Sequence, residues 1–322
     1  MTDALGIVPT WLNYGGIGGC SATGGVARAM SAIRDGMCEV VVVISADAHS
    51  TDWRSNYGAY RDEFQDPLGV QGPPATFGLL MSRYVHQYGL KPKALGKIAI
   101  TQRNGALVND NAYKKFKKEL TMAEYLDSRV IADPLRLLDS VMFCDSANTF
   151  LVTTEKTAQR QGLKKAVYPV AYGEVTNFKG NEASPDITQS GFTKIGPEVL
   201  KKAGMTPKEV RMFHPYDDFT IAVMMKMEAF GFCKVGQGSC YVLEHDFSPS
   251  GDLPLNTGGG QISAGQPGLA SGGLNLAEAV RQMFDEAGAR QVKNPSNALV
   301  TGIGVIPYAR NWGTSSAMIL EM

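Results

Sequence analysis

Apolar residues recur at helical spacing over residues 21–35, directly after a glycine-rich segment, and a polar Asp-Gly pair ends the run. Four of them fall on one side of the expected helix: Val26, Ala29, Met30 and Ile33. The next apolar run, residues 39–47, is a continuous β-branched stretch without alternation. Such a run predicts a strand buried on both faces, and this helix–strand order predicts a βαβ unit around a covered sheet.

The rest of the chain predicts two α/β halves, the first with an insertion. Residues 48–140 lack a regular apolar period and are rich in Asn, Arg, Tyr and Pro, so we expect an irregular insertion with short helices. Strand or helix patterns return over residues 146–162, 164–176, 197–210, 211–218, 220–232, 256–288 and 297–322. We therefore predict an N-terminal half over residues 1–165 and a C-terminal half over residues 166–322.

Composition and charge narrow the classes of function. The 322 residues are 44% hydrophobic and 19% charged, as in an ordinary globular protein. Lys plus Arg and Asp plus Glu each number 31, so no overall field attracts nucleic acid or a membrane surface. No apolar run approaches about 18 residues and the first residues lack a signal-peptide pattern, so we expect neither a membrane span nor a leader.

The cysteines favour a reducing compartment. There are five, an odd number, mostly in apolar contexts: Cys20, Cys38, Cys144, Cys233 and Cys240. This usage favours free thiols in a cytoplasmic protein over a disulfide framework. No CxxC pair is present, so we expect no metal site built by this chain alone.

The glycine-rich residues 15–19 end at Cys20 and Ser21, a pair that we call the elbow. The spacing of these glycines does not match the GxGxxG fingerprint, so we expect no nicotinamide cofactor. Two interpretations of the elbow stay open. It is either a tight turn with a buried thiol, or a nucleophile at a helix N-terminus, where the dipole lowers a thiol pKa and backbone N–H groups hold an oxyanion.

Several motifs, in their order along the chain, resemble the thiolase superfamily, and within it the sterol-carrier-protein-type thiolases and lipid-transfer-protein-like aldolases. They include YDDFT beside the family's HD-x-FT, and NTGGG…GQPG beside its NxxGG…GHPxG. The segments cover residues 18–47, 109–139, 144–154, 214–238 and 256–283. The resemblance implies a thiolase-like fold of two related βαβ halves in α/β/α/β/α layers, with a CoA thioester as substrate and no bound cofactor.

The residues that carry thiolase chemistry are replaced at each matching position. The resemblance places Ser21 at the nucleophilic cysteine and Tyr216 at the histidine of HD-x-FT. It places Gln266 at the histidine of GHP and Thr301 at the late cysteine. A serine without a neighbouring base is a poor nucleophile, because its hydroxyl stays protonated at neutral pH. Thiolase chemistry would therefore require Cys20, with the elbow shifted by one residue.

Tyr216 instead resembles a tyrosine of relatives that split β-hydroxyacyl-CoA side chains of steroids. A phenol acts as base or acid in a preorganised pocket, especially where nearby donors lower its pKa. Asp217 matches the same motif, whereas the second tyrosine of these aldolases has no counterpart near Gln266. Tyr308 either enters the pocket in its place or is a surface or interface ring.

We therefore expect a carbon–carbon lyase that cleaves a β-hydroxyacyl-CoA by a retro-aldol reaction. A thiolase-type acyltransferase that uses Cys20 and a non-catalytic scaffold that binds acyl-CoA or a partner are the alternatives. Polar residues of the insertion are candidates to hold CoA, as are glycines whose backbone approaches a ligand closely. These candidates are Arg103, Asn109, Lys114, Lys115, Gly259 and Gly304.

Other polar and sulfur-containing residues have structural interpretations. We expect His214 to be a partly buried imidazole with satisfied hydrogen bonds, and the methionines of residues 220–230 to fill the core. His49 and Asp47 follow a strand, where an α/β fold tends to place ligands, but the resemblance gives them no role.

The resemblance also carries expectations about the N-terminus and about partners. Family members have a further βαβα stretch before the elbow, so we expect a shortened or internally started N-terminal half. A homodimer is implied, with residues 9–16 pairing across the two-fold axis. Relatives often work with a small zinc-containing OB-fold partner, and neither nucleic acid nor a membrane is expected.

Overall fold

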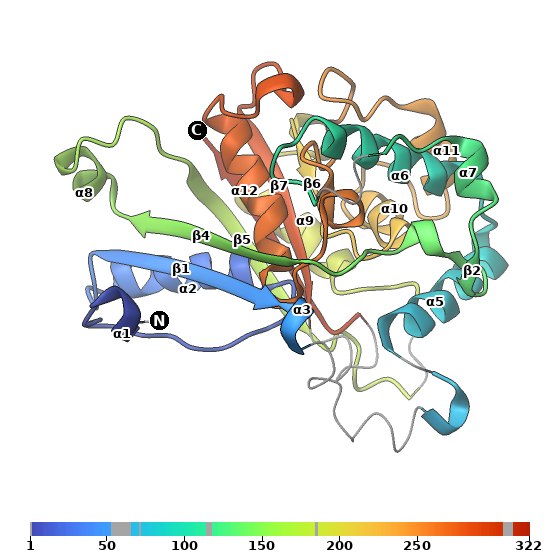
Figure 1. Ribbon diagram of the computed structural model, residues 1–322, viewed down its shortest axis with the longest axis horizontal. Coiled ribbons are helices and arrows are strands. Elements are labelled where there is room, and N and C mark those ends of the chain that lie inside the picture. Colours follow the sequence, from blue (N-terminus) through green and yellow to red (C-terminus); the bar gives the residue numbers. More distant parts are fainter. Residues whose placement is uncertain (1, 53–65, 71, 114–117, 184–185, 305–311) are drawn as a thin grey trace.

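The computed structural model describes residues 2–52, 66–70, 72–113, 118–183, 186–304 and 312–322. Over this part of the chain two sheets alternate with two layers of helices, and the helices of the predicted insertion pack beside them (Figure 1). The α/β class is thereby confirmed. Of the five expected layers, the described residues form four.

The larger sheet has the strand order β5-β8-β7-β6. Its strands are β5 (Tyr168–Thr176), β8 (Thr314–Glu321), β7 (Asn297–Gly304) and β6 (Phe213–His214). β8 is antiparallel to both neighbours, whereas β6 and β7 are parallel. The parallel pair places the segment after β6 beside the carboxyl end of β7, where an α/β sheet commonly holds its site.

Alternation along the strands divides the hydrophobic core into two. Val300 and Met318 are directly opposite each other in the register and face one helix layer, while Leu299 and Ile319 face the other. The first layer is α2 (Ser21–Arg34) and α12 (Ser271–Met283); the second is α9 (Phe192–Lys202) and α10 (Thr220–Ala229). Because side chains of a strand alternate between faces, each face packs on its own helices.

The smaller sheet pairs β1 (Val40–Ala48) with β4 (Asp145–Thr153), antiparallel and in continuous register. Val43 and Phe150 pack toward the α2–α12 layer. Val42 and Leu151 point away from it and are 46% and 58% exposed. The strand is therefore where the sequence predicts it, but the prediction of burial on both faces and of a βαβ unit was wrong, because β1 pairs antiparallel and only one face is covered.

The helix after the elbow is confirmed as α2. Its buried side is formed by Ala22, Val26, Ala29 and Ala32, together with Thr23 and Gly24. Met30, which was expected on that side, is 37% exposed. The buried side consists mostly of small residues because α2 lies between two sheets and close to α12.

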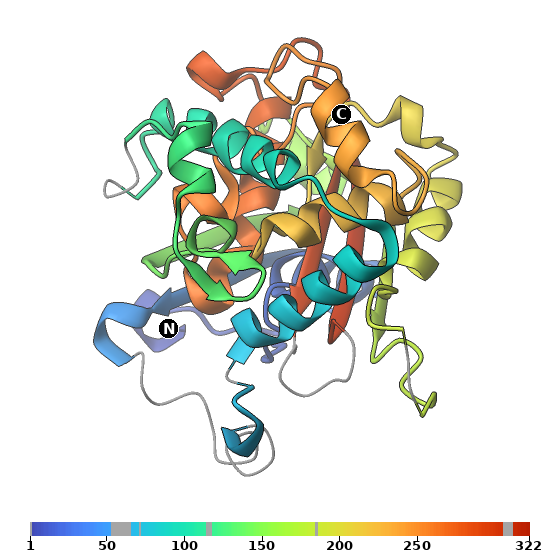
Figure 2. The same cartoon turned by 90° about the vertical axis from the view of Figure 1, so that its right-hand side faces the viewer.

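The insertion is more regular than its composition predicts. It contains two long helices, α5 (Gly72–Tyr88) and α6 (Pro92–Leu107), before the short α7 (Met122–Leu126). Figure 2 shows these helices on the face toward the viewer. Phe77, Tyr84 and Ile98 are buried in the same core as α9 and α10. The expectation of only short helices was wrong, because packing against the C-terminal half stabilises segments of weak amphipathic period.

The remaining elements are short. The helices are α1 (Thr2–Leu5), α3 (His49–Asp52), α8 (Glu155–Arg160) and α11 (Gly238–Glu244), and the strands are β2 (Val130–Ala132) and β3 (Leu135–Arg136). The predicted helix over residues 197–210 begins earlier, at Phe192, and ends at Lys202. Met224, Met225 and Met227 are buried in α10, as expected. Among the described helices, none combines the length and the apolar character needed to cross a bilayer.

Candidate active site around Tyr216

Ser21 is the first residue of α2, and its hydroxyl is used by the turn that precedes the helix. Its Oγ donates to the Gly18 carbonyl at 2.6 Å and accepts from the Ile17 N–H at 3.0 Å. These bonds close the glycine-rich turn onto the helix start. The proton of Ser21 thus points at a neutral carbonyl rather than at a base, so the geometry does not activate this hydroxyl.

Cys20 caps α2 with helical backbone angles, and its side chain is fully buried. Its Sγ donates to the Thr314 carbonyl of β8 at 3.4 Å. Burial raises the pKa of this thiol to about 12. Of the two interpretations of the elbow, this geometry favours the tight turn with a buried thiol, because loss of solvation outweighs the helix dipole for a buried thiolate.

Glycines allow the elbow to pack directly against its neighbours. A Cβ at Gly19 would lie 2.0 Å from the ring of Tyr216. A Cβ at Gly272 or Gly302 would lie 2.1 or 2.5 Å from the Gly19 carbonyl oxygen, and one at Gly304 would lie 1.7 Å from that of Ile17. Three chain segments therefore meet through backbone alone, as only glycine permits.

Two of the glycines expected at a ligand contact other parts of the protein instead. Gly304 lies against Ile17 of the glycine-rich turn. Gly259 has a φ of 103°, and a Cβ there would lie 2.6 Å from Cβ of Ala106 on α6. The structure thus gives both glycines a packing role, and their prediction as CoA contacts is not supported by these positions.

Tyr216 lies between the elbow and the start of α12. Its N–H donates to Thr301 Oγ1 at 2.9 Å, and its hydroxyl lies 2.7 Å from Ser271 Oγ. The ring is 3% exposed. Burial raises the pKa of this phenol well above 10, and the negative charge of Asp218 adds to the rise. Hydrogen bonding with Ser271 and Gln266 does lower this pKa, but burial outweighs it, so the phenol keeps its proton at neutral pH.

Asp217 holds the single π-helical turn Gly260–Ala264. Its Oδ2 accepts from the Ile262 N–H and its Oδ1 from Asn275 Nδ2, both at 3.1 Å. A Cβ at Gly260 would lie 2.2 Å from Oδ2, so the turn approaches the carboxylate through glycine. Burial raises the pKa of Asp217 to about 6. With both oxygens bonded, this carboxylate positions the turn and Asn275.

Asp218 and Lys226 also belong to the site, and our sequence analysis did not single them out. Both are buried, and Asp218 Oδ1 has no hydrogen-bond partner among the described residues. Lys226 Nζ donates to the Tyr216 carbonyl and lies 5.1 and 5.8 Å from the ring centroids of Phe192 and Trp312. The available signals were a second acidic residue after Tyr216 and one lysine within a largely apolar helix.

The two charges act on each other. Burial raises the pKa of Asp218 to about 7, and the positive charge of Lys226 opposes this rise. Burial also lowers the pKa of Lys226, and the two neighbouring carboxylates oppose that change. In a medium of low dielectric constant, each group depends on the other for its charge.

Gln266 joins the same cluster, as predicted for its position in the family motif. Its hydrogen bonding lowers the pKa values of both Tyr216 and Asp218, and its Oε1 accepts from the Gly268 N–H at 3.0 Å. Its backbone carbonyl accepts from the Cys144 N–H. The structure therefore brings Tyr216, Gln266 and the buried thiol of Cys20 together around the elbow, whereas Ser21 faces the preceding turn.

The structure does not bring the predicted CoA-binding residues of the insertion together. Arg103 lies within α6, where it is buried and donates from Nε to Ser263 Oγ and from Nη1 to the Lys118 carbonyl. It was expected in an irregular loop but connects α6 to two neighbouring segments. Lys115 and its neighbour Lys114 lie outside the described residues, as does Tyr308.

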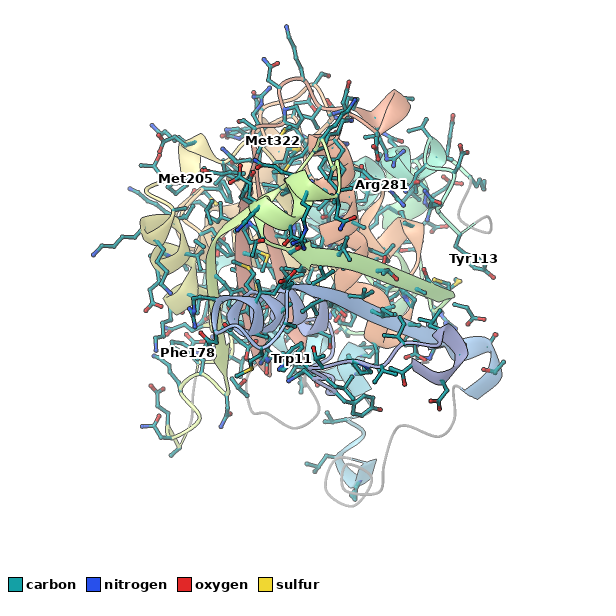
Figure 3. All side chains as sticks on the ribbon, turned by 90° about the vertical axis from the view of Figure 1, so that its left-hand side faces the viewer. Trp11, Tyr113, Phe178, Met205, Arg281 and Met322 are labelled. Atoms are coloured by element: carbon teal, nitrogen blue, oxygen red, sulfur yellow. The ribbon has the colours of Figure 1, made fainter. Side chains whose placement is uncertain are left out.

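Asn109 lines a cavity of about 180 Å³ between the segment that follows α6, β4 and α12. Asn256, Asn275 and Arg281 contribute to the same cavity. A second, more open cavity of about 340 Å³ shares part of this wall and extends past Tyr113; Figure 3 labels Arg281 and Tyr113. Asn275 connects the first cavity to the site, because its Nδ2 also donates to Asp217.

His214 differs from expectation, whereas His49 and Asp47 lie at the end of β1 as expected. His214 is fully buried and neither ring nitrogen has a partner among the described residues, so the expectation of a satisfied, partly buried imidazole was wrong. Burial lowers its pKa to about 4. His49 Nε2 lies 3.8 Å from Asp47 Oδ2, and Asp47 Oδ2 accepts from the Leu269 N–H at 3.1 Å. Asp47 therefore ties the end of β1 to the segment before α12.

Known proteins are similar to this chain in sequence and in architecture. A family model described as "Thiolase C-terminal domain-like" matches residues 173–320. A steroid side-chain-cleaving aldolase of Thermomonospora curvata is 28% identical over 309 residues, covering 90% of this chain and 77% of the relative. The benzoylsuccinyl-CoA thiolase subunit BbsB of Thauera aromatica is 28% identical over 290 residues, covering 88% and 74%.

A solved structure gives the same fold. The protein named "Ltp2-ChsH2(DUF35) aldolase" superposes with a TM-score of 0.76 at 24% identity, covering 94% of this chain and 78% of that one. The layered sheets thus have a counterpart in a solved structure. In sequence and in fold the chain is thus similar to the thiolase superfamily, and within it to the sterol-carrier-protein-type thiolases and their aldolase relatives.

Proposed function

We propose that this protein cleaves the carbon–carbon bond of a β-hydroxyacyl-CoA by a retro-aldol reaction. The observation that carries the proposal is the buried, protonated hydroxyl of Tyr216 at the position where thiolases have a histidine. The similarity to a protein named as a steroid side-chain-cleaving aldolase supports this reaction. An acyl group resembling a steroid side chain is accordingly the first substrate to test.

The chemistry fits a phenol that keeps its proton. When the bond between the α- and β-carbons breaks, negative charge develops on the thioester oxygen as an enolate forms. A hydrogen-bond donor at that oxygen lowers the barrier, and it does so most strongly in a site that excludes water. The raised pKa of Tyr216 makes it a donor at neutral pH, and Ser271 Oγ orients its hydroxyl. No covalent intermediate is needed.

A thiolase-type acyltransfer is the second candidate, since one relative is named as a thiolase subunit. That reaction needs a thiolate that attacks the acyl group. Cys20 is fully buried with a pKa raised to about 12, so the described geometry disfavours it as the nucleophile. A non-catalytic protein that binds acyl-CoA remains the third candidate and is separated from the others by turnover.

Two partners belong to the proposal. We propose a homodimer and a small zinc-containing OB-fold protein, as the family resemblance implies. The cavity beside Asn109 and Asn275 is proposed to hold the amide-containing arm of CoA, because amide side chains both donate to and accept from such groups. Exchange of Asn109 for alanine is then expected to raise KM for the thioester more than it lowers kcat.

The proposal is tested by incubating the purified protein with a panel of β-hydroxyacyl-CoA thioesters in buffer without free CoA. The assay is run with and without the small partner. Thiolysis requires CoA as the attacking thiol, whereas retro-aldol cleavage does not. We expect an aldehyde or ketone and a shorter acyl-CoA. We also expect Tyr216→Phe to lower the rate by about 100-fold or more, the range for one acid–base or oxyanion group, and Cys20→Ala to have little effect.

Two results would contradict it. Turnover of a β-ketoacyl-CoA only after CoA is added, together with loss of activity in Cys20→Ala, would identify an acyltransferase. Equal loss of cleavage in Tyr216→Phe and Cys20→Ala would remove the assigned role of the phenol.

A further inference from the structure

A retro-aldol reaction needs a proton acceptor for the β-hydroxyl as well as a donor for the enolate. Within the part of the chain that the structure describes, most polar groups around Tyr216 are unsuited to accept this proton. Tyr216 and Cys20 stay protonated because burial raises their pKa values. Ser21 donates its proton to a carbonyl, and both oxygens of Asp217 accept hydrogen bonds.

Asp218 has the geometry that the others lack. It directly follows Asp217 in the sequence, and its side chain is 7% exposed. Its Oδ1 has no hydrogen-bond partner among the described residues. Its carboxylate is close enough to Tyr216 and Gln266 for hydrogen bonding from both to stabilise its charge. An unpartnered carboxylate oxygen in a buried site costs free energy, so a group that approaches it with an O–H is favoured.

We propose that Asp218 is the catalytic base of this protein, accepting the proton of the substrate's β-hydroxyl at Oδ1 while Tyr216 donates to the thioester oxygen. This assignment rests on the proposed retro-aldol function. It names a residue that lies at the variable position of the family's HD-x-FT motif, outside the positions discussed for thiolase chemistry.

The proton and electron balance closes with these two groups. The β-hydroxyl O–H bond breaks, its proton passes to Asp218, and its electron pair forms the new carbonyl. The bond between the α- and β-carbons breaks, and its electron pair forms the enolate of the shorter thioester. Protonated Asp218 then returns the proton to the α-carbon. One proton thus moves from oxygen to carbon, with no oxidant, reductant or added nucleophile.

The surroundings of Asp218 suit a group that both takes and gives a proton. A general base works best when its pKa lies near the operating pH. Burial and Asp217 raise the pKa of Asp218, whereas Lys226, Tyr216 and Gln266 oppose the rise, leaving it at about 7. Lys226 is therefore a positioning residue for the charge of Asp218.

The closing experiment uses the reverse half of the reaction, so it does not depend on the right β-hydroxy substrate. The full chain, with its small partner, is incubated with propionyl-CoA in D₂O, and deuterium at the α-carbon is measured by mass spectrometry. Wild type is expected to exchange this hydrogen, with a rate that falls as the pH falls through about 7. Asp218→Asn is expected to lower exchange and cleavage by about 100-fold or more. KM is expected to change little.

The matched control is Asp35→Asn, an exposed carboxylate at the end of α2, which should exchange and cleave like wild type. If Asp218→Asn does not fold, Asp218→Glu decides. This variant keeps a carboxylate but changes its position, so the acidic limb of the pH–rate profile should move to a different pH. An acidic limb that does not move would overturn the assignment.

The outcomes separate this assignment from the proposed function. Suppose that wild type exchanges or cleaves, and that a folded Asp218→Asn variant has the same rate or the same acidic limb in its pH–rate profile. This result overturns the role of Asp218 alone. A wild-type protein that neither cleaves the β-hydroxyacyl-CoA panel nor exchanges propionyl-CoA overturns the proposed function, and the assignment falls with it.

Discussion

The hydroxyl of Tyr216 lies 2.7 Å from Ser271 Oγ, and both groups are buried where the elbow meets α12. This contact holds the phenol oxygen in place, and either hydroxyl can be the donor in it. We predict that Ser271→Ala lowers kcat for thioester cleavage by about fivefold with KM nearly unchanged, since one hydrogen bond contributes about 1 kcal/mol. Ser315→Ala is the matched control, because Ser315 is equally buried and its Oγ has no partner among the described residues. Equal effects of the two variants would show that Ser271 acts only in packing.

Gly19 offers a steric test of the same site. A methyl group there would overlap the ring of Tyr216 and the Ile303 carbonyl. We predict that Gly19→Ala lowers the free energy of unfolding by about 1–3 kcal/mol, the usual cost of overpacking, and also lowers activity by displacing the ring. Gly15→Ala, where a Cβ meets nothing within 4 Å, should leave both unchanged. Chemical denaturation of the two variants checks this, and wild-type stability in Gly19→Ala would contradict it.

Cys20 should be chemically inert. Its thiol is fully buried and its pKa is raised to about 12, so almost no thiolate is present at neutral pH. We predict that iodoacetamide at pH 7.5 modifies Cys38 and Cys240, which are partly exposed, before Cys20. Peptide mass spectrometry over time measures the order. Labelling of Cys20 as fast as Cys38, with parallel loss of activity, would restore the acyltransferase interpretation.

The fold was predicted from sequence better than the site. Apolar runs and glycines placed α2, β1, β4 and the closing strands because their patterns are local. The single covered face of β1 and the length of α5 and α6 were missed, because both depend on distant packing partners. Family motifs brought Tyr216 and Gln266 together correctly. The rise in the pKa values of Tyr216 and Cys20 was not predicted, because burial is not visible in a motif.

Lys226 should set the pH dependence of the reaction. Its positive charge opposes the rise in the pKa of Asp218 that burial causes. Lys226→Met removes this charge at similar volume, so the pKa of Asp218 should rise further. Because the base must be unprotonated, we predict that the acidic limb of the rate profile moves to higher pH. Lys201→Met, on the exposed side of α9, should leave the profile unchanged. A profile that does not move would mean that the limb belongs to another group.

His214 should couple stability to acid. Its pKa is lowered from 6.5 to about 4 by burial, so the unfolded chain takes up the proton first. Stability contributed by the neutral imidazole is therefore present above pH 6.5 and is lost as the pH falls toward 4. Asp217 and Asp218, with raised pKa values, act in the opposite direction over part of this range.

The measurement must therefore compare variants. We predict that the urea midpoint falls more between pH 7.5 and pH 5 in wild type than in His214→Phe. The exposed His86 provides the control, because His86→Gln should fall as much as wild type. Equal slopes for wild type and His214→Phe would mean that His214 is protonated in the folded state.

The glycine contacts between residues 17–19, 272 and 302–304 have a consequence for altering this protein. A side chain at a crowded position escapes a clash by changing rotamer, but a carbonyl oxygen packed on a Cα atom has no such freedom. The place of the phenol is therefore set by main chain from three distant segments. Residues in the cavity walls can therefore be substituted to accept new acyl groups. Tyr216 keeps its position relative to the elbow as long as these glycines are retained.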